Sequence, residues 1–353
     1  MEDLRDVTSQ RPRHPSARVE DRVNSAVARW LRRRGWVPRV EPYPGYGGPG
    51  WVRVMARALL AAPGTRAREA VERDAESAQR AIRGWRSFLT VPVPRASIEV
   101  RIGTTTHELV SDRSGYVDAV LPCGLPTGWG EISLNVGGEP VTAPILMVPP
   151  GPGVAMVSDI DDTVMVTALP RLFLVAWNAL VLHENARRVV PGMVGLYRRW
   201  QAKHPGAPTF YLSTGAWNVA PAVRRFLGRH GYPQGPLLLT DWGPTNAGWF
   251  RSGPEHKRAQ LRRLMSEFPD LQWVLVGDDG QHDPQIYSEI AEEYPERVLA
   301  IAIRELSPAE QLLAHGTPVP TRDGEITGAA APVVVHGADG NALALAFIDR
   351  GLV

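Results

Sequence analysis

Apolar residues in the second half of the chain form short, nearly unbroken runs that alternate with amphipathic stretches. The runs lie at residues 154–157, 209–212, 237–239, 273–276, 298–303 and 332–335. Between most of them, apolar positions recur every three or four residues, which predicts helices at 191–203, 219–229, 257–268 and 284–294. Strands that are apolar on both faces and alternate with helices are typical of a parallel sheet with helices on both sides. The pattern therefore predicts an α/β domain.

The first half of the chain shows a different pattern, with strand-like segments separated by turns. We expect strands at 37–43, 52–59, 97–103, 106–111, 116–121, 131–136 and 142–148, a helix at 66–90 and a glycine- and proline-rich turn at 44–50. Short strands at this spacing favour a β-sandwich or a small barrel. Arg101, His107 and Asp112 are too scattered to form a catalytic group, and we interpret them as surface residues.

The two patterns meet at the sequence VPPGPG, residues 148–153, which predicts a linker. We expect a smaller β-rich domain over 17–148 and the α/β domain over 149–353. Residues 1–16 are charged and contain proline, and they predict a disordered tail. A short amphipathic helix should follow near 19–31. Its arginines favour a solvated face, with a lipid-binding patch as the alternative.

Composition limits the kinds of partner and the cellular compartment that we expect for this protein. The net charge of +2 is close to neutral and argues against a nucleic-acid partner. Cys123 is the only cysteine, which excludes an intramolecular disulfide and a cysteine metal site. The first 20 residues lack an apolar signal core, and the longest apolar run, 172–182, is shorter than the roughly 20 residues of a membrane span. We expect a cytoplasmic protein that at most touches a membrane surface, and the sequence does not predict its oligomeric state.

Acidic residues follow two of the predicted strands. Asp159 and Asp161 come at the end of the first strand of the α/β domain, and Asp278 and Asp283 follow the strand at 273–276. Ligands bind beyond the carboxyl ends of parallel strands, so we expect these carboxylates to gather there. Crowded carboxylates require a cation or a shared proton. A ligand set made only of oxygen favours Mg²⁺ over zinc.

Two further features could complete a phosphate site. Ser213 and Thr214 follow the apolar run at 209–212 and precede a predicted helix, where a hydroxyl and backbone N–H groups can bind an anion. Lys257 opens the predicted helix at 257–268 and could place its ammonium against phosphate or against a carboxylate. Only two of the 39 lysines and arginines are lysines, which makes Lys257 more conspicuous.

These motifs, in this order, resemble those of the haloacid dehalogenase superfamily of phosphatases. The matching residues are Asp159, Asp161 and Thr163 in a DxDxT motif, then Ser213, Lys257, Asp278 and Asp283. The resemblance implies a doubly wound, Rossmann-like parallel sheet with a small helical cap insertion at about 168–190. SDIDDTV, FYLSTGAW, LVGDDGQHDPQIY, YPERV and AIAIREL resemble more narrowly the actin-patch-associated phosphatidate phosphatase family and its bacterial relatives. That family implies Mg²⁺-dependent conversion of phosphatidate to diacylglycerol and phosphate.

The resemblance also implies a role for each site residue. Asp159 would form an aspartyl-phosphate, and Asp161 would protonate the leaving oxygen and later activate water, although spacing alone allows the reverse order. Mg²⁺ would be held by Asp159, the backbone carbonyl of Asp161 and Asp278, with Asp283 either as a further ligand or as a partner of the ligands. The substrate would be bound by Thr163, Ser213, Thr214 and Lys257. We interpret Asp162 and Asp279 as hydrogen-bonded turn residues.

Other functions stay open at this point. One is a phosphatase of a soluble metabolite or of a polynucleotide end, and another is a non-catalytic module that binds lipid or a partner. The paired Asp159 and Asp161 argue against the second, because binding alone requires no nucleophile beside an acid. The apolar segment 169–188 predicts a buried cap helix. The alternative is a lipid-facing gate with Arg171, Arg187 and Arg188 near the headgroups.

Overall fold

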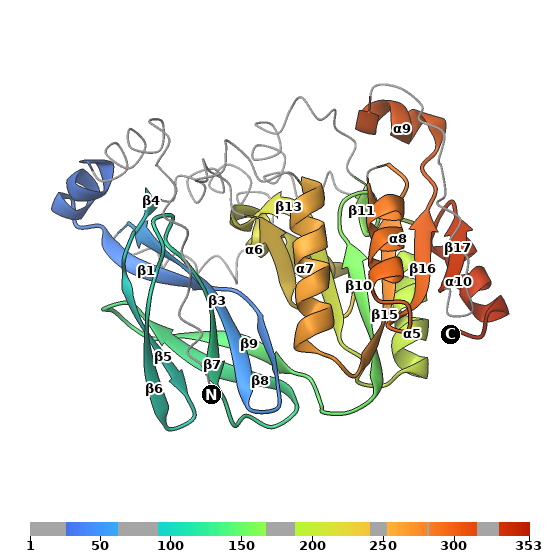
Figure 1. Ribbon diagram of the computed structural model, residues 1–353. Helices are drawn as coiled ribbons and strands as arrows, with labels where there is room; N and C mark the ends of the chain where they lie inside the picture. Colours follow the sequence, from blue (N-terminus) through green and yellow to red (C-terminus); the bar gives the residue numbers. More distant parts are fainter. Residues whose placement is uncertain (1–25, 63–90, 167–187, 241–252, 281, 316–331) are drawn as a thin grey trace.

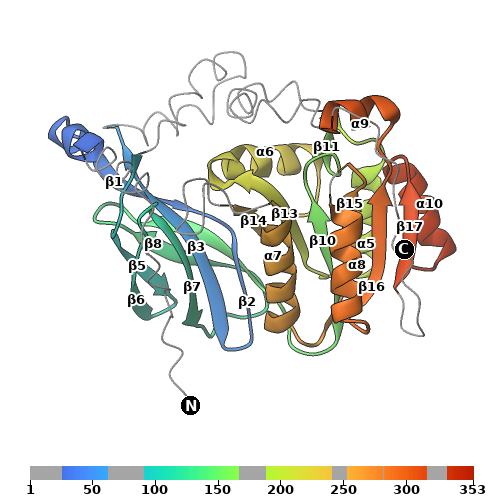
Figure 2. The same ribbon diagram turned by 45° about the horizontal axis from the view of Figure 1, so that its top comes forward.

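The computed structural model describes residues 26–62, 91–166, 188–240, 253–280, 282–315 and 332–353 (Figure 1). These residues form two large sheets that lie side by side in both views (Figures 1 and 2). The expected tail at 1–16, the helix at 66–90 and nearly all of the cap insertion lie outside the described residues. The domain boundaries at 17–148 and 149–353 stay predictions.

Nine strands form the first sheet. They are β1 (Val37–Pro42), β2 (Gly45–Gly48), β3 (Trp51–Ala61), β4 (Val91–Pro92), β5 (Ser97–Ile102), β6 (Thr105–Val110), β7 (Tyr116–Pro122), β8 (Gly128–Asn135) and β9 (Val141–Met147). Alternate residues such as Val52 and Val54 of β3 share one apolar core with Ile98 of β5 and Leu134 of β8. A helix over residues 26–33 adds apolar side chains to this core. The sheet therefore folds over its own apolar face.

The segment at 44–50 is more than the turn predicted for it. Gly45–Gly48 form β2, which is buried and pairs antiparallel with β3 and parallel with β9. A Cβ on Gly45 would lie 2.4 Å from the carbonyl oxygen of Arg53, and one on Gly47 would lie 2.3 Å from that of Trp51. Only glycine permits this approach of the backbones. Propensity rules place glycine in turns, which is why the strand escaped the sequence pattern.

The second sheet has six parallel strands. They are β10 (Gly153–Asp159), β13 (Thr209–Ala216), β14 (Leu237–Thr240), β15 (Leu271–Asp278), β16 (Val298–Arg304) and β17 (Val333–Gly337). Their spatial order is β14-β13-β10-β15-β16-β17, so the chain winds outward from β10 in one direction and then from β15 in the other. This is the strand order of doubly wound sheets, whose ligands bind where the order reverses. Here that place lies between the ends of β10 and β15.

Helices cover both faces of the second sheet. They are α5 (Met193–Lys203), α6 (Ala220–His230), α7 (Gly253–Glu267), α8 (Asp283–Glu293), α9 (Pro308–His315) and α10 (Gly340–Asp349). Figure 1 shows α7 and α8 on one face, with α5 and α10 on the other. The short strands β11 (Met165–Val166) and β12 (Arg188–Val189) pair antiparallel and flank the segment where the cap insertion is expected. Among the described residues, no helix is long and apolar enough to cross a membrane.

The two sheets share a buried contact. Tyr46 of β2 is fully buried, and its ring packs edge-on against Phe210 of β13, with 5.3 Å between ring centroids. Its hydroxyl donates to Glu267 at 2.8 Å, at the end of α7. Arg53 of β3 donates to the same carboxylate at 3.1 Å. Burial with paired charges joins the first sheet to α7.

Candidate active site

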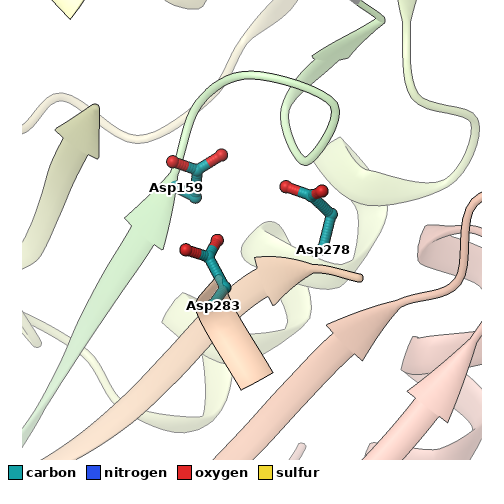
Figure 3. A group of neighbouring side chains, drawn as sticks. All are labelled: Asp159, Asp278 and Asp283. Carbon is teal, nitrogen blue, oxygen red and sulfur yellow. The ribbon is translucent and has the colours of Figure 1, made fainter. Parts of the chain in front are cut away.

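Three buried carboxylates converge where the strand order of the second sheet reverses (Figure 3). Asp159 ends β10, Asp278 ends β15, and Asp283 is the first residue of α8. One oxygen from each lies within 4.8 Å of the others. β10 and β15 are neighbouring parallel strands with Ser158 in register with Val276, so their last residues reach the same edge. The register of β10 and β15 therefore places Asp159 beside Asp278.

Lys257 closes this group with a positive charge. Its Nζ lies 2.7 Å from Oδ1 of Asp159 and 2.5 Å from Oδ1 of Asp283, and its side chain is buried. Burial disfavours the charged ammonium, but Asp159, Asp283 and Asp278 outweigh burial and raise the pKa of Lys257 above its usual range. Lys257 is therefore charged and ties the end of β10 to the start of α8.

The charges of these four groups do not balance. Three ionised carboxylates and one ammonium leave a net charge of −2 in a buried site. Burial, reinforced by the neighbouring carboxylates, raises the pKa of Asp159 and of Asp278 well above the usual range, although Lys257 opposes the shift. Oδ2 of Asp159 and Oδ2 of Asp283 are buried without a hydrogen-bond partner. Unsatisfied buried oxygens beside a deficit of two positive charges fit a divalent, oxygen-binding cation such as Mg²⁺.

Asp161 faces a different partner. The hydroxyl of Ser213, on β13, donates to Oδ2 of Asp161 at 2.9 Å and accepts a hydrogen bond from the N–H of Gly215 at 2.9 Å. Asp161 is partly exposed, and its carboxylate is not among the three that cluster. Its predicted contact with the metal is thus left to its backbone carbonyl, as the resemblance implies. The side chain of Asp161 is instead held by the hydrogen bond from Ser213 of β13.

Hydrogen bonds fix the backbone of the loop that carries Asp161. Asp162 adopts a left-handed backbone with φ of 57°, and its N–H donates to the carbonyl of Met165 at 2.8 Å. Arg304, buried at the end of β16, donates from Nη1 to the carbonyl of Asp162 at 2.6 Å and from Nη2 to Glu310 at 2.6 Å. Sequence reasoning overlooked Arg304, yet it shares the strand-end position that identified the other site residues. It fixes the loop that presents Asp161.

Two details differ from the sequence-based expectations. Ser213 and Thr214 lie inside β13, which runs on to Ala216 and is followed by a 3-10 helix, η4 (Trp217–Val219), so they do not begin a helix. The register of β13 and β14 shifts between Leu212 and Ala216, and this irregularity lets the strand continue through the motif. The hydroxyl of Ser213 remains in the site, but an anion-binding helix start at this point is not supported.

The second difference concerns Lys257, and Thr163 makes a contact that the sequence did not predict. α7 begins at Gly253, so Lys257 lies in its second turn instead of opening it. Thr163 is fully buried, and its hydroxyl donates to Oδ2 of Asp278 at 3.3 Å. Thr163 therefore supports a carboxylate of the cluster, and its predicted contact with substrate stays a prediction.

Asp279 is a hydrogen-bonded turn residue, as expected. The carboxylate of Asp279 accepts a hydrogen bond from the N–H of Leu306 at 2.7 Å, away from the cluster. His282 precedes α8 without a side-chain capping hydrogen bond. Arg188 is exposed on β12. Arg171, Arg187 and residues 241–243 lie outside the described residues.

Comparisons with known proteins point to the same part of the chain. Residues 154–305 match the family described as "Phosphatidate phosphatase APP1, catalytic domain", which confirms the narrower resemblance, to the actin-patch-associated phosphatidate phosphatase family. Phosphatidate phosphatase APP1 of Saccharomyces cerevisiae is 25% identical over 153 residues, which cover 43% of this chain and 26% of the yeast protein. An uncharacterized protein of Schizosaccharomyces pombe is 28% identical over 158 residues, 44% of this chain and 25% of its own.

The matched segments span about a quarter of the length of either curated relative, 26% and 25% respectively. A solved carbohydrate acetylesterase from Xanthomonas citri aligns with 80% of this chain and 76% of its own at 10% identity, with a TM-score of 0.27.

Proposed function

We propose that this protein is a Mg²⁺-dependent phosphatase of the haloacid dehalogenase type that converts phosphatidate to diacylglycerol and phosphate through an aspartyl-phosphate on Asp159. One observation carries the proposal. Asp159 is buried at the end of β10 with one oxygen on Lys257, and its other oxygen has no partner although Asp278 and Asp283 lie beside it. The family match over residues 154–305 supports the lipid substrate.

The first step uses Asp159 and Asp161. An oxygen of the Asp159 carboxylate attacks phosphorus, a P–O bond to Asp159 forms, and the P–O bond to diacylglycerol breaks. A protonated Asp161 gives its proton to the departing oxygen, because an alkoxide is a poor leaving group without one. The Ser213 hydroxyl at 2.9 Å supports this role, since it orients the Asp161 carboxyl group.

The second step regenerates Asp159. The Asp161 carboxylate accepts a proton from a water molecule, whose oxygen attacks phosphorus and releases inorganic phosphate from Asp159. Throughout both steps, the Lys257 ammonium holds Oδ1 of Asp159, so that this carboxylate keeps one orientation. Burial raises the pKa of Asp159, and the Lys257 ammonium opposes this shift. A divalent cation held by the three carboxylates would oppose it further and favour the ionised nucleophile.

The cluster fits the metal that the resemblance implies. Asp159, Asp278 and Asp283 would hold Mg²⁺ together with the backbone carbonyl of Asp161. The ion, when bound, neutralises negative charge on the phosphate and on these carboxylates. Thr163 and the N–H of Gly280, at 3.3 and 2.8 Å from the two oxygens of Asp278, orient that ligand.

The direct test is Asp159→Asn, which keeps the shape of the side chain and removes the nucleophile. Phosphate release from vesicles containing phosphatidate should fall by at least about a thousandfold, because the covalent route is lost. Acid-quenched wild-type protein should carry label from ³²P-phosphatidate that hydroxylamine removes, and the variant should carry none. Circular dichroism checks the fold, and Asp279→Asn is the matched control, since that carboxylate faces away from the cluster.

Two outcomes separate the parts of the proposal. Unchanged turnover by Asp159→Asn would refute the covalent mechanism. If the wild-type protein cleaves p-nitrophenyl phosphate with Mg²⁺ but leaves phosphatidate intact, the mechanism stands and the lipid substrate is wrong.

A further inference from the structure

The helix over residues 26–33 has an exposed apolar face that the proposed chemistry does not use. Ala28 and Leu31 are buried against the core of the first sheet. On the outside, Trp30 is 50% exposed and Val27 is 38% exposed, and Val37, at the start of β1, is 56% exposed. A helix that only covers the sheet would turn its tryptophan inward, because aromatic side chains contribute most to an apolar core.

The same helix end carries a concentrated positive charge. Arg29, Arg32, Arg33 and Arg34 are exposed, and residues 26–40 contain no aspartate or glutamate. The guanidinium of Arg34 lies 3.7 Å from the centroid of the Trp30 ring. The whole chain has a net charge of only +2, so this charge is local. Tryptophan with arginine on one exposed helix suits the headgroup layer of a bilayer, where the ring is half immersed and the guanidinium groups reach phosphates.

The helix lies on the side of the molecule that holds the candidate active site. In Figures 1 and 2, which differ by 45°, it lies in the upper part of the molecule, as does the upper end of β10, where the chain passes to β11. Asp159 ends β10 at this edge. A bilayer that contacts the helix would therefore lie on the same side of the molecule as the edge of the second sheet where the carboxylates gather.

We propose that helix 26–33 docks the protein on an anionic lipid bilayer, with Trp30 and Val27 at headgroup depth and the arginines on lipid phosphates. A bilayer fits better than a nucleic acid, because the exposed surface is apolar at three positions as well as basic. The purpose of this docking rests on the proposed lipid substrate. The docking itself does not, because it requires neither Asp159 nor turnover.

Flotation with vesicles tests the surface directly. We use full-length protein with vesicles of phosphatidylcholine alone or with about a third phosphatidylserine, enough for a strongly negative surface. The wild type should float only with the anionic vesicles. Arg29→Gln/Arg33→Gln should weaken partitioning about twenty-fivefold, from about fivefold per arginine. Trp30→Ala should weaken it at least about fivefold through lost apolar insertion.

Matched variants test whether binding depends on helix 26–33 or on any exposed arginine or tryptophan of the protein. Arg198→Gln/Arg199→Gln removes the same charge from an exposed part of α5, and Trp129→Ala removes a tryptophan that is 41% exposed on β8. Both should float like the wild type. Equal flotation by Trp30→Ala, Arg29→Gln/Arg33→Gln and the wild type would overturn the proposal, as would a wild type that does not float. Binding of a single-stranded oligonucleotide in place of vesicles, through the same arginines, would also overturn it.

Turnover of p-nitrophenyl phosphate keeps this inference distinct from the proposed function. Every docking variant should retain wild-type turnover of this soluble ester, because none of the altered side chains lies in the site. If the wild type floats but does not turn over the ester, the proposed function fails and the docking surface stands. If turnover is normal and flotation is absent, the docking surface fails alone.

Discussion

The charge imbalance at the candidate metal centre makes a prediction about stability that does not depend on catalysis. Asp278→Asn keeps the shape of a fully buried side chain and removes one of three clustered negative charges. The amide oxygen can still accept the hydrogen bond that Gly280 N–H now gives to Oδ1, and Thr163 can accept where it now donates. The substitution therefore tests charge with little change in packing.

The size of the effect follows from the geometry. Neutralising Asp278 removes its repulsion from Asp159 and Asp283 and its attraction to Lys257, a net loss of one repulsion. The clustered oxygens lie within 4.8 Å of one another. At that separation, and with an effective dielectric constant of about 20, one such pair is worth about 3 kcal/mol. We therefore expect the metal-free variant to melt roughly 6–12 °C above the metal-free wild type at pH 8.

Magnesium should narrow this difference. At a concentration of one hundred times its dissociation constant, an ion that binds only the folded state contributes about 2.7 kcal/mol, or roughly 5–10 °C for a domain of this size. Asp278→Asn should lose more than half of that gain, because it lacks one ligand. The assay is thermal unfolding by circular dichroism in chelator and over a Mg²⁺ titration, with Asp279→Asn as the control that should respond like the wild type.

The pH dependence has a definite sign. Burial and neighbouring carboxylates raise the pKa of Asp159 and Asp278 in the folded state, so the folded protein binds protons more tightly than the unfolded chain. In chelator, the wild type should therefore lose stability as pH rises from the usual aspartate range of about 4 through the raised values. Asp278→Asn should flatten this loss. A metal-free variant that melts below the wild type, or one with an undiminished Mg²⁺ response, would refute the reasoning.

Three further substitutions test individual contacts. Ser213→Ala should lower kcat about ten- to hundredfold with little change in KM, because the Asp161 carboxyl loses a charge-assisted hydrogen bond worth about 1.5–3 kcal/mol; a change confined to KM would contradict it. Arg304→Gln should lower kcat about tenfold by releasing the Asp162 carbonyl, with partial rescue by Arg304→Lys in steady-state kinetics. Glu267→Gln should lower the free energy of unfolding by about 2 kcal/mol in urea titrations, since its contacts with Arg53 and Tyr46 weaken.

The sequence predicted the second sheet well because its strands are buried on both faces. Each of the six apolar runs lies in one strand, and the acidic residues stand at strand ends that the parallel register brings to one edge. Asp159, Asp278 and Asp283 could be expected to meet for this reason alone. The side chain of Lys257 reaches them from α7, one of the two placements that its position near a predicted helix start allowed.

Features that depend on contacts between distant residues escaped the pattern. Positions 45 and 47 of β2 are glycine because the carbonyl groups of Arg53 and Trp51 leave no room for a Cβ. No residue next to them in the sequence indicates that crowding. β13 continues through Ser213 because its pairing with β14 shifts register. Arg304 acts on a loop that precedes it by 142 residues. In each case the structure depends on a residue that is distant in the sequence. Local propensity therefore predicted a different structure or gave no prediction.

The contact between the two sheets bears on how Lys257 is placed. Lys257 lies near the start of α7, and Glu267, the last residue of that helix, is held by Tyr46 and Arg53 of the first sheet. These two points on one helix are separated by about 15 Å at 1.5 Å per residue. Because a helix packed at both ends moves as a unit, the first sheet restrains the position of the ammonium without touching the site. The family match begins at residue 154, yet residues of β2 and β3 before it hold the helix that carries Lys257. The nine-stranded sheet is in this sense part of the framework of the candidate active site.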